Sequence, residues 1–180
     1  MRVEKFHFKP QKDQFIAARG GLRTLLADYL HQKPAEICFG YGEYGKPYIE
    51  NTDLNFSLSH SGNHIVYAVT RGASIGVDIE EIKQDIDFLS VGKLVFSEAE
   101  YTQFLTVPED ERALAFYRGW TRKEAYIKAI GMGLHFPLSE VQNTFLPREW
   151  QLEEMMLNEN TVLAIAVQST GNHVLFKDFK

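Results

Sequence analysis

Two short acidic motifs constrain what this chain can fold into. The first, Gly-Val-Asp-Ile-Glu at residues 76–80, alternates apolar and acidic side chains and predicts a strand. Alternate side chains of a strand share a face, so Asp78 and Glu80 point the same way while the Val and Ile between them point into the core. The strand therefore presents two carboxylates side by side.

The second motif predicts a helix that carries a third carboxylate. Its sequence is Trp-Thr-Arg-Lys-Glu-Ala-Tyr-Ile-Lys, at residues 120–128. Residues four apart share a helix face, so Trp120, Glu124 and Lys128 form one row. If this helix packs beside the end of the strand, three carboxylates and one ammonium meet, and three such oxygen donors suit Mg2+. The predicted metal ligands are Asp78, Glu80 and Glu124.

Each motif also has a simpler interpretation. Asp78 and Glu80 can form an ordinary solvated strand face. Glu124 and Lys128 can form an ordinary helix ion pair, worth roughly 0.2–0.5 kcal/mol. It is the combination of the two motifs that favours a catalytic site.

Composition limits the class of protein. The chain has 180 residues, 44% hydrophobic and 24% charged, which is enough apolar content for one or two compact domains. Its formal net charge of -5, without a long basic run, argues against nucleic-acid binding. Cys38 is the only cysteine, so neither an intrachain disulfide nor a cysteine-based metal site is expected. We find no signal peptide and no run of about 18 apolar residues, and we expect a cytoplasmic protein without a membrane partner.

Periodicity and turn signals predict the order of the elements. Apolar residues at helical spacing predict a first helix over about residues 12–31. A capping box at Ser97 predicts the start of a short helix, and the helix with the second acidic motif should end at Gly131. This order predicts an α+β fold with two halves, residues 1–72 and 73–180. Strands are expected at 37–39, 55–59, 65–69, 75–79, 163–167 and 174–176.

Two further features are candidates for binding phosphate. Arg19 and Arg23 lie four apart on the first helix, on an edge that is either solvated or faces a phosphate. The segment 40–46, Gly-Tyr-Gly-Glu-Tyr-Gly-Lys, fits both the dinucleotide fingerprint and the start of a P-loop. Both motifs need a helix directly after the glycines, and Pro47 disfavours one there. We therefore reject the dinucleotide fingerprint and the P-loop. The segment still predicts a glycine-rich turn whose backbone can approach a ligand, with Lys46 able to reach a phosphate.

Three more motifs accompany the acidic pair. They are Gly-Lys-Pro at 45–47, Asn-x-Ser-x-Ser-His-Ser at 55–61 and Phe-Ser-x-x-Glu at 96–100. Over about residues 2–168, this set resembles the 4'-phosphopantetheinyl transferases, and most closely their longer, monomeric branch, which activates surfactin-type peptide synthetases. The resemblance implies two pseudo-symmetric α/β halves with the ligand held between them.

The resemblance also implies a reaction, a cofactor and partners. 4'-Phosphopantetheine would pass from coenzyme A to a serine of an apo acyl or peptidyl carrier protein, with release of 3',5'-ADP. Mg2+ would be held by Asp78, Glu80 and Glu124, and Lys128 would stabilise charge on the phosphates. Glu124 is also the candidate base, but metal binding and proton transfer compete for one carboxylate, so its role stays open. The resemblance places the carrier protein near residues 86–89.

Coenzyme A would lie against residues of both halves. In the family, the Gly-Lys-Pro segment lines the adenine and phosphate end of coenzyme A, and the Ser-His pair contacts its phosphates. Taken alone, His60 would be an ordinary hydrogen-bonded histidine. The predicted coenzyme A residues are Arg19, Arg23, Lys46, Pro47, Ser59 and His60.

The N-terminal half departs from the family pattern in two ways. Relatives of the longer branch carry an additional segment, with a strand and basic residues, before the part that matches residues 2–6, and we expect it to be missing here. Gln14 stands where many relatives have a basic residue, which weakens the expected site for the 3'-phosphate. We expect a monomer, or self-association through an exposed sheet edge in this half.

Two other functions fit part of the sequence. A non-catalytic relative that binds coenzyme A or a carrier protein fits the missing segment but not the intact acidic set. A Mg2+-dependent phosphohydrolase on an unrelated α/β fold would show signs such as a His-Asp metal pair, which this sequence lacks. The short, trimeric branch of the transferases fits less well, because this chain supplies both halves itself.

Overall fold

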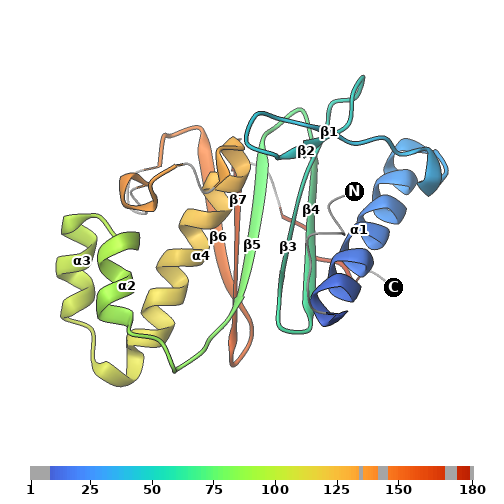
Figure 1. Cartoon of the computed structure of the whole chain (residues 1–180). Coiled ribbons are helices and arrows are strands. Elements are labelled where there is room, and N and C mark those ends of the chain that lie inside the picture. The colour runs from blue at the N-terminus through green and yellow to red at the C-terminus, as the bar shows by residue number, and fades with distance from the viewer. Residues whose placement is uncertain (1–8, 134–135, 142–145, 169–173, 179–180) are drawn as a thin grey trace.

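The computed structural model describes residues 9–133, 136–141, 146–168 and 174–178. It contains helices together with three antiparallel sheets, so the α+β class predicted from the sequence is confirmed. In Figure 1 the long strands stand side by side in the middle of the molecule, with α1 on one flank and α4, α3 and α2 on the other. None of the described helices is both long enough and apolar enough to cross a membrane.

The N-terminal elements consist of one long helix and two small sheets. Leu22 and Leu26 on the helix pack against Leu54 and Phe56 of a strand, and this apolar contact holds the helix on the sheet. The two-stranded sheets pair β1 with β2 and β3 with β4, both antiparallel. The elements are α1 (Lys9–Leu30), β1 (Gly40–Tyr41), β2 (Pro47–Tyr48), β3 (Leu54–Ser61) and β4 (His64–Arg71), with a 3-10 turn at Pro34–Glu36.

The C-terminal elements form a three-stranded antiparallel sheet in the order β5-β7-β6, with three helices over one face. Gly131 ends the long helix in the left-handed conformation, with a φ of 77°, as the sequence predicts. The elements are β5 (Ile75–Glu81), α2 (Phe88–Val95), α3 (Glu98–Leu105), α4 (Arg112–Ile130), β6 (Trp150–Asn158) and β7 (Thr161–Gln168), with 3-10 turns at Glu109–Glu111 and Leu138–Glu140.

Helix α4 lies unusually close to β5 because the residues between them are small. Ala125 and Ala129 of the helix share a buried cluster with two alanines of β7. Gly76 of β5 faces the helix directly. A Cβ at Gly76 would lie 2.0 Å from the Ala125 carbonyl oxygen and 2.4 Å from the Ala129 amide nitrogen. The glycine of the first acidic motif therefore sets how near α4 can approach the strand.

Serine hydroxyls join β3 to β5. The Val77 amide donates to Ser57 Oγ at 3.1 Å, and the Glu81 amide donates to Ser61 Oγ at 2.9 Å. These bonds satisfy backbone donors on the edge of the three-stranded sheet that β7 does not cover. The two groups of elements are thus tied together by side chains where the β3-β4 and β5-β7-β6 sheets meet.

Most of the predicted elements are confirmed, and the exceptions have local causes. The predicted strand at 37–39 is wrong because the strand of this region is β1, which begins only at Gly40. The predicted strand at 174–176 is also wrong, since these residues are irregular. The sequence patterns did not predict helix α2 or strand β6. Gly92 lies inside α2, and β6 carries two adjacent glutamates, so neither segment shows a clean periodic pattern.

We expect Gly76→Ala to be severely destabilising, because the new Cβ would overlap the backbone of α4, which cannot move without separating the alanine cluster. Overpacking of this kind typically costs about 1–3 kcal/mol, and rigid backbone on the far side places this case at or above the upper end. Urea unfolding followed by circular dichroism measures the free energy of unfolding.

Gly20→Ala is the matched control. Gly20 lies inside α1, and an added Cβ there would meet nothing within 4 Å. Ala is favoured over Gly in a helix interior by about 1 kcal/mol, so this variant should be more stable than the wild type. Equal and small effects of the two substitutions would contradict the close approach of α4 to β5.

Candidate active site

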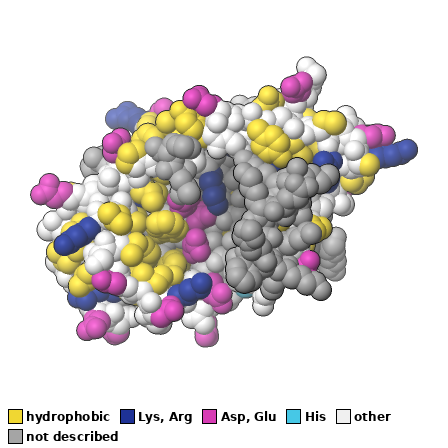
Figure 2. Space-filling model, viewed as in Figure 1, with side chains coloured by type: hydrophobic (Ala, Val, Ile, Leu, Met, Phe, Trp, Pro, Cys, Tyr) yellow, Lys and Arg dark blue, Asp and Glu magenta, His cyan; other side chains and the backbone are white. Residues whose placement is uncertain are grey.

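A cleft of about 280 Å³ opens between β3, β5 and α4. Trp120, Glu124 and Lys128 lie in it together, so the predicted row on one helix face is confirmed. Asp78 and Glu80 of β5 enter the same cleft, which confirms that the two acidic motifs meet. Figure 2 shows acidic side chains with a basic group beside them in the hollow between the two groups of elements.

Lys128 forms its ion pair across the cleft. Among the described side chains, its Nζ donates to Asp78 Oδ1 at 2.5 Å and to Ser59 Oγ at 2.9 Å, rather than pairing with Glu124 on its own helix. Ser59 Oγ in turn donates to Asp78 Oδ1 at 2.9 Å. The simple helix ion pair considered from the sequence is therefore not the arrangement that forms. Lys128 instead ties α4 to β5.

The three carboxylates differ in how many of their oxygens are engaged. Both oxygens of Glu80 accept hydrogen bonds, one from Trp120 Nε1 at 3.3 Å and one from Ser61 Oγ at 3.1 Å. Asp78 Oδ2 and Glu124 Oε1 are buried and have no hydrogen-bond partner among the residues that the structure describes. A buried carboxylate oxygen without a partner is costly, so these two atoms mark a place where a ligand is expected.

Burial raises the pKa of all three carboxyl groups above the ordinary range. For Asp78 the ion pair with Lys128 opposes this effect, whereas for Glu80 and Glu124 the neighbouring charge of Asp78 raises the pKa further. Groups of like charge with raised pKa values in a cleft are typical of functional sites. A cation that enters the cluster would therefore lower the electrostatic free energy of the three carboxylates.

The oxygen-only donor set fits a hard divalent cation such as Mg2+. The two buried oxygens without partners, on Asp78 and Glu124, support this fit. Within the described part of the chain, however, no three His, Cys, Asp or Glu side chains already stand close enough together to hold a metal ion. Binding a cation would therefore require Asp78, Glu80 and Glu124 to draw together.

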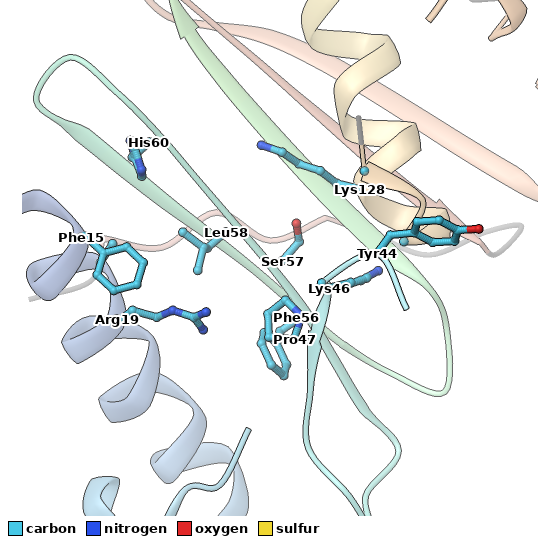
Figure 3. A pocket seen from close by; sticks show the side chains of 14 residues that line it. Phe15, Arg19, Tyr44, Lys46, Pro47, Phe56, Ser57, Leu58, His60 and Lys128 are labelled. Carbon is cyan, nitrogen blue, oxygen red and sulfur yellow. The ribbon is translucent and has the colours of Figure 1, made fainter. Parts of the chain in front are cut away.

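A second cavity, of about 290 Å³, adjoins the first (Figure 3). The two share Leu58, His60 and Lys128, so Lys128 faces both. Most of the remaining lining is apolar or aromatic, with cationic side chains at two places. It includes Phe15, Ala18 and Arg19 of α1, Tyr44 to Pro47, and Phe56 and Ser57 of β3.

Arg19 reaches this second cavity from α1. Its guanidinium carbon lies 5.3–5.7 Å from the ring centres of Phe15, Phe39 and Tyr41. Nη2 donates to the Tyr41 hydroxyl at 3.2 Å, whereas Nη1 is buried and finds no hydrogen-bond partner in the described part of the chain. Rings around a guanidinium hold its plane in place. Arg19 thus offers a fixed, unused donor to an anion in the cavity.

Arg23 has a different position. Its Nη1 donates to the backbone carbonyls of Ile37 at 2.5 Å and Pro34 at 3.1 Å, and the side chain does not line the cavity. Gln14, which directly precedes Phe15 on α1, donates from Nε2 to the Gly62 carbonyl at 2.9 Å. The Arg23 side chain thus holds the segment that follows α1, and the Gln14 side chain holds the turn between β3 and β4.

Lys46 and Pro47 lie at the edge of the second cavity, where β2 begins. Lys46 Nζ donates to the carbonyls of Ile75 at 3.0 Å and Ala129 at 2.7 Å. The Ala129 carbonyl is in the last turn of α4, where a cation interacts favourably with the helix dipole. Burial lowers the pKa of the Lys46 ammonium to about 8. Lys46 therefore ties the glycine-rich loop to the C-terminal elements.

Sequence reasoning missed the role of Lys123, the neighbour of Glu124. Lys123 is fully buried, and its Nζ donates to Glu100 Oε2 at 2.6 Å and to the carbonyls of Val95 and Leu138, both at 3.0 Å. Glu100 also closes the capping box of α3 by accepting from the Ser97 amide. All three donors of the ammonium are used. The Phe-Ser-x-x-Glu motif is therefore structural, because it fixes α2 and α3 around α4.

Comparison with known proteins identifies the family. The family model of the 4'-phosphopantetheinyl transferase superfamily matches residues 74–174, and the model described as 4'-phosphopantetheinyl transferase, N-terminal, matches residues 1–72. The chain belongs to the 4'-phosphopantetheinyl transferase superfamily. The resemblance inferred from the motifs is thereby confirmed at the level of the family.

Similar proteins bear the same description. The chain is 34% identical to 4'-phosphopantetheinyl transferase HetI of Nostoc sp. over 94% of this chain and 77% of that protein. It is 37% identical to a 4'-phosphopantetheinyl transferase of Bacillus subtilis over 76% of this chain and 60% of that protein. It is 30% identical to a putative 4'-phosphopantetheinyl transferase of Synechocystis sp. over 92% and 76% of the two chains. The chain thus spans between about three fifths and three quarters of these relatives.

We expect Lys128→Met to lower the free energy of unfolding by about 3 kcal/mol at neutral pH without divalent cations, because it leaves the buried Asp78 carboxylate uncompensated. Adding Asp78→Asn to the same chain should recover most of this loss, because the charge that Lys128 neutralises is then gone. Urea unfolding of the wild type, the two single variants and the double variant gives the coupling energy. Additive effects would show that the pair is not a stabilising unit.

Proposed function

We propose that this protein transfers 4'-phosphopantetheine from coenzyme A to a serine of an apo acyl or peptidyl carrier protein and releases 3',5'-ADP. The observation that carries the proposal is the junction of two cavities at Lys128. One cavity gathers carboxylates, and the other offers aromatic rings and Arg19. A dinucleotide-like substrate with a pyrophosphate at its centre fits such a pair, since its reacting phosphate would lie beside Lys128.

The acidic cavity would neutralise and position the pyrophosphate. Asp78, Glu80 and Glu124 would hold Mg2+, which when bound would offset the negative charge of the pyrophosphate oxygens. Lys128 faces both cavities and would stabilise charge that develops on the bridging oxygen during transfer. Trp120 keeps Glu80 oriented by the hydrogen bond from its indole.

Proton removal from the carrier serine would fall to Glu124. The serine Oγ attacks the phosphorus that bears pantetheine, the bond from this phosphorus to the bridging oxygen breaks, and 3',5'-ADP leaves. Glu124 Oε1 has no hydrogen-bond partner and its pKa is raised by burial, so it can accept the serine proton directly or through water. Because the same carboxylate would also be a ligand of the cation, proton transfer and metal binding would compete for it.

The second cavity would hold the nucleotide end of coenzyme A between the N-terminal and C-terminal elements. Arg19 presents the donor without a partner, His60 lies where the cavities meet, and Lys46 and Pro47 form the opposite edge. Arg23 would act from behind by fixing the loop that carries Phe39, because its guanidinium is already bonded to carbonyls of that loop.

The carrier protein would dock beside the acidic cavity, near residues 86–89. Asp87 caps α2 by accepting from the Ser90 amide, and the helix that it caps exposes Leu89 and Leu94. These exposed leucines would give the carrier an apolar contact on α2. We further propose that the protein acts as a monomer, as in the longer branch of the family.

Mass spectrometry tests the proposed function. An apo carrier protein incubated with coenzyme A, Mg2+ and this protein should gain the mass of one phosphopantetheine group. Glu124→Gln keeps the shape of the side chain but removes its charge and its basicity, and we expect at least a hundred-fold slower transfer. Binding of coenzyme A without any mass gain by the carrier would favour the alternative of a non-catalytic relative.

Arg19 and Arg23 form a matched pair for testing the nucleotide cavity. Arg19→Gln should weaken coenzyme A binding about ten- to hundred-fold, since a hydrogen bond to a charged group is worth roughly 1.5–3 kcal/mol. Arg23→Gln should leave the affinity nearly unchanged and lower the melting temperature instead, because it releases two loop carbonyls. Calorimetric titration with coenzyme A and thermal unfolding separate the two effects. Equal losses of affinity would place both arginines at the ligand.

A further inference from the structure

Alternate serines in the C-terminal part of β3 face β5. Ser57, Ser59 and Ser61 are two residues apart and therefore lie on one face of the strand. Two of them accept hydrogen bonds from backbone amides of β5, as described above. The contacts advance in the same direction along both strands, so β3 and β5 run side by side in parallel. The serines thus set the register of the N-terminal sheet against the strand that carries the carboxylates.

Ser59 differs from its neighbours because it bonds to the acidic cluster. Its hydroxyl donates to Asp78 Oδ1 at 2.9 Å and accepts from Lys128 Nζ at 2.9 Å, and Lys128 closes the triangle on the same carboxylate oxygen. Ser59 is 6% exposed and Asp78 is 3% exposed, so water contributes little to either group. The triangle joins β3, β5 and α4 at one point.

The triangle determines which oxygen of Asp78 is available. Oδ1 receives both hydrogen bonds, whereas Oδ2 is buried and receives none from the residues described in the structure. A side chain that is held at one oxygen keeps the other at a fixed position and orientation. Partners of this kind, behind a ligand residue, typically change metal affinity by 10–100-fold when they are removed.

We propose that Ser59 is a positioning residue: it holds Asp78 and Lys128 so that Asp78 Oδ2 alone faces the cation, and it does not itself bind the phosphates of coenzyme A. This inference rests on the proposed function, because it concerns the cation that the acidic cluster would hold. It reassigns Ser59 from the phosphate contact that the family resemblance implies.

The hydroxyl of Ser59 has no capacity left for a phosphate. A serine hydroxyl has one proton to donate, and this one is donated to Asp78. A phosphate oxygen is an acceptor, so it would have to take that proton away from the buried carboxylate. His60, the next residue, is exposed and faces both cavities, which makes it the better phosphate contact of the two.

Thermal unfolding in a Mg2+ titration, without coenzyme A, tests the proposal. Ser59→Ala should raise the Mg2+ concentration at half-maximal stabilisation by about ten-fold or more. Ser59→Thr keeps the hydroxyl and should stay near the wild-type value. Ser57→Ala is the control for loss of a serine from the same strand, because among the described residues Ser57 Oγ bonds to the Val77 amide and not to the acidic cluster. This variant should lower the melting temperature without shifting the Mg2+ response.

Steady-state kinetics of carrier modification supply the second measurement. Ser59→Ala should lower kcat at least ten-fold at limiting Mg2+, with the KM for coenzyme A changed less than about two-fold, and high Mg2+ should restore part of the rate. A raised KM with an unchanged Mg2+ response would show that Ser59 contacts phosphate directly and would overturn the proposal.

The same measurements distinguish a failure of the proposed function from a failure of the positioning role of Ser59. A wild-type protein whose melting temperature does not respond to Mg2+ would remove the cation site itself, and with it the role of Ser59. A wild type that responds, together with a Ser59→Ala variant that responds equally, would overturn only the positioning role and leave the proposed function standing.

Discussion

The close approach of α4 to β5 is the constraint on which the rest of the structure depends. It requires a residue without a side chain at position 76, because even a methyl group there would overlap the helix backbone. The alanines around this contact fill the remaining space without pushing the elements apart. Only at this separation can Lys128 reach Asp78 and can Glu124 enter the same cleft as Glu80. A packing requirement thereby determines the electrostatics of the site.

The acidic cluster is stable only because its charge is partly compensated. Three carboxyl groups with raised pKa values face one ammonium, and two buried oxygens stay without partners. Such a cluster contributes little to the stability of the fold and is better explained as a site prepared for a cation and an anionic substrate. The fully bonded Lys123, on another face of the same helix, shows the contrast: there every donor is satisfied and no ligand is needed.

Polar contacts join the N-terminal and C-terminal elements beside a buried apolar cluster, in which Ala68 of β4 packs with Ile75 and Val77 of β5. The Ser57 and Ser61 hydroxyls accept from amides of β5, and the Lys46 ammonium donates to carbonyls of β5 and α4. Ser59 and Lys128 add charged hydrogen bonds at the same seam. Because the proposed substrate would lie along this seam, the contacts that hold the parts together also shape the site. The two family models, which meet between residues 72 and 74, divide the chain near the same seam.

Local patterns in the sequence were sufficient for the acidic site. The period of a strand placed Asp78 and Glu80 on one face, the period of a helix aligned Trp120, Glu124 and Lys128, and Gly131 ended that helix as expected. These features depend on backbone geometry within a few residues, which sequence reports directly. The same reasoning missed α2 and β6, where a glycine and adjacent glutamates blur the periodicity.

Only the tertiary structure decided the partners of the charged side chains. The sequence could not show that Lys128 pairs with Asp78 instead of Glu124, or that Arg23 and Lys46 bond to carbonyls. It also could not show that Arg19 has a buried donor without a partner among the described residues. Spacing along the chain fixes which face a residue occupies. What stands opposite that face is determined by how separate elements pack, and here a single glycine against a helix backbone determines it.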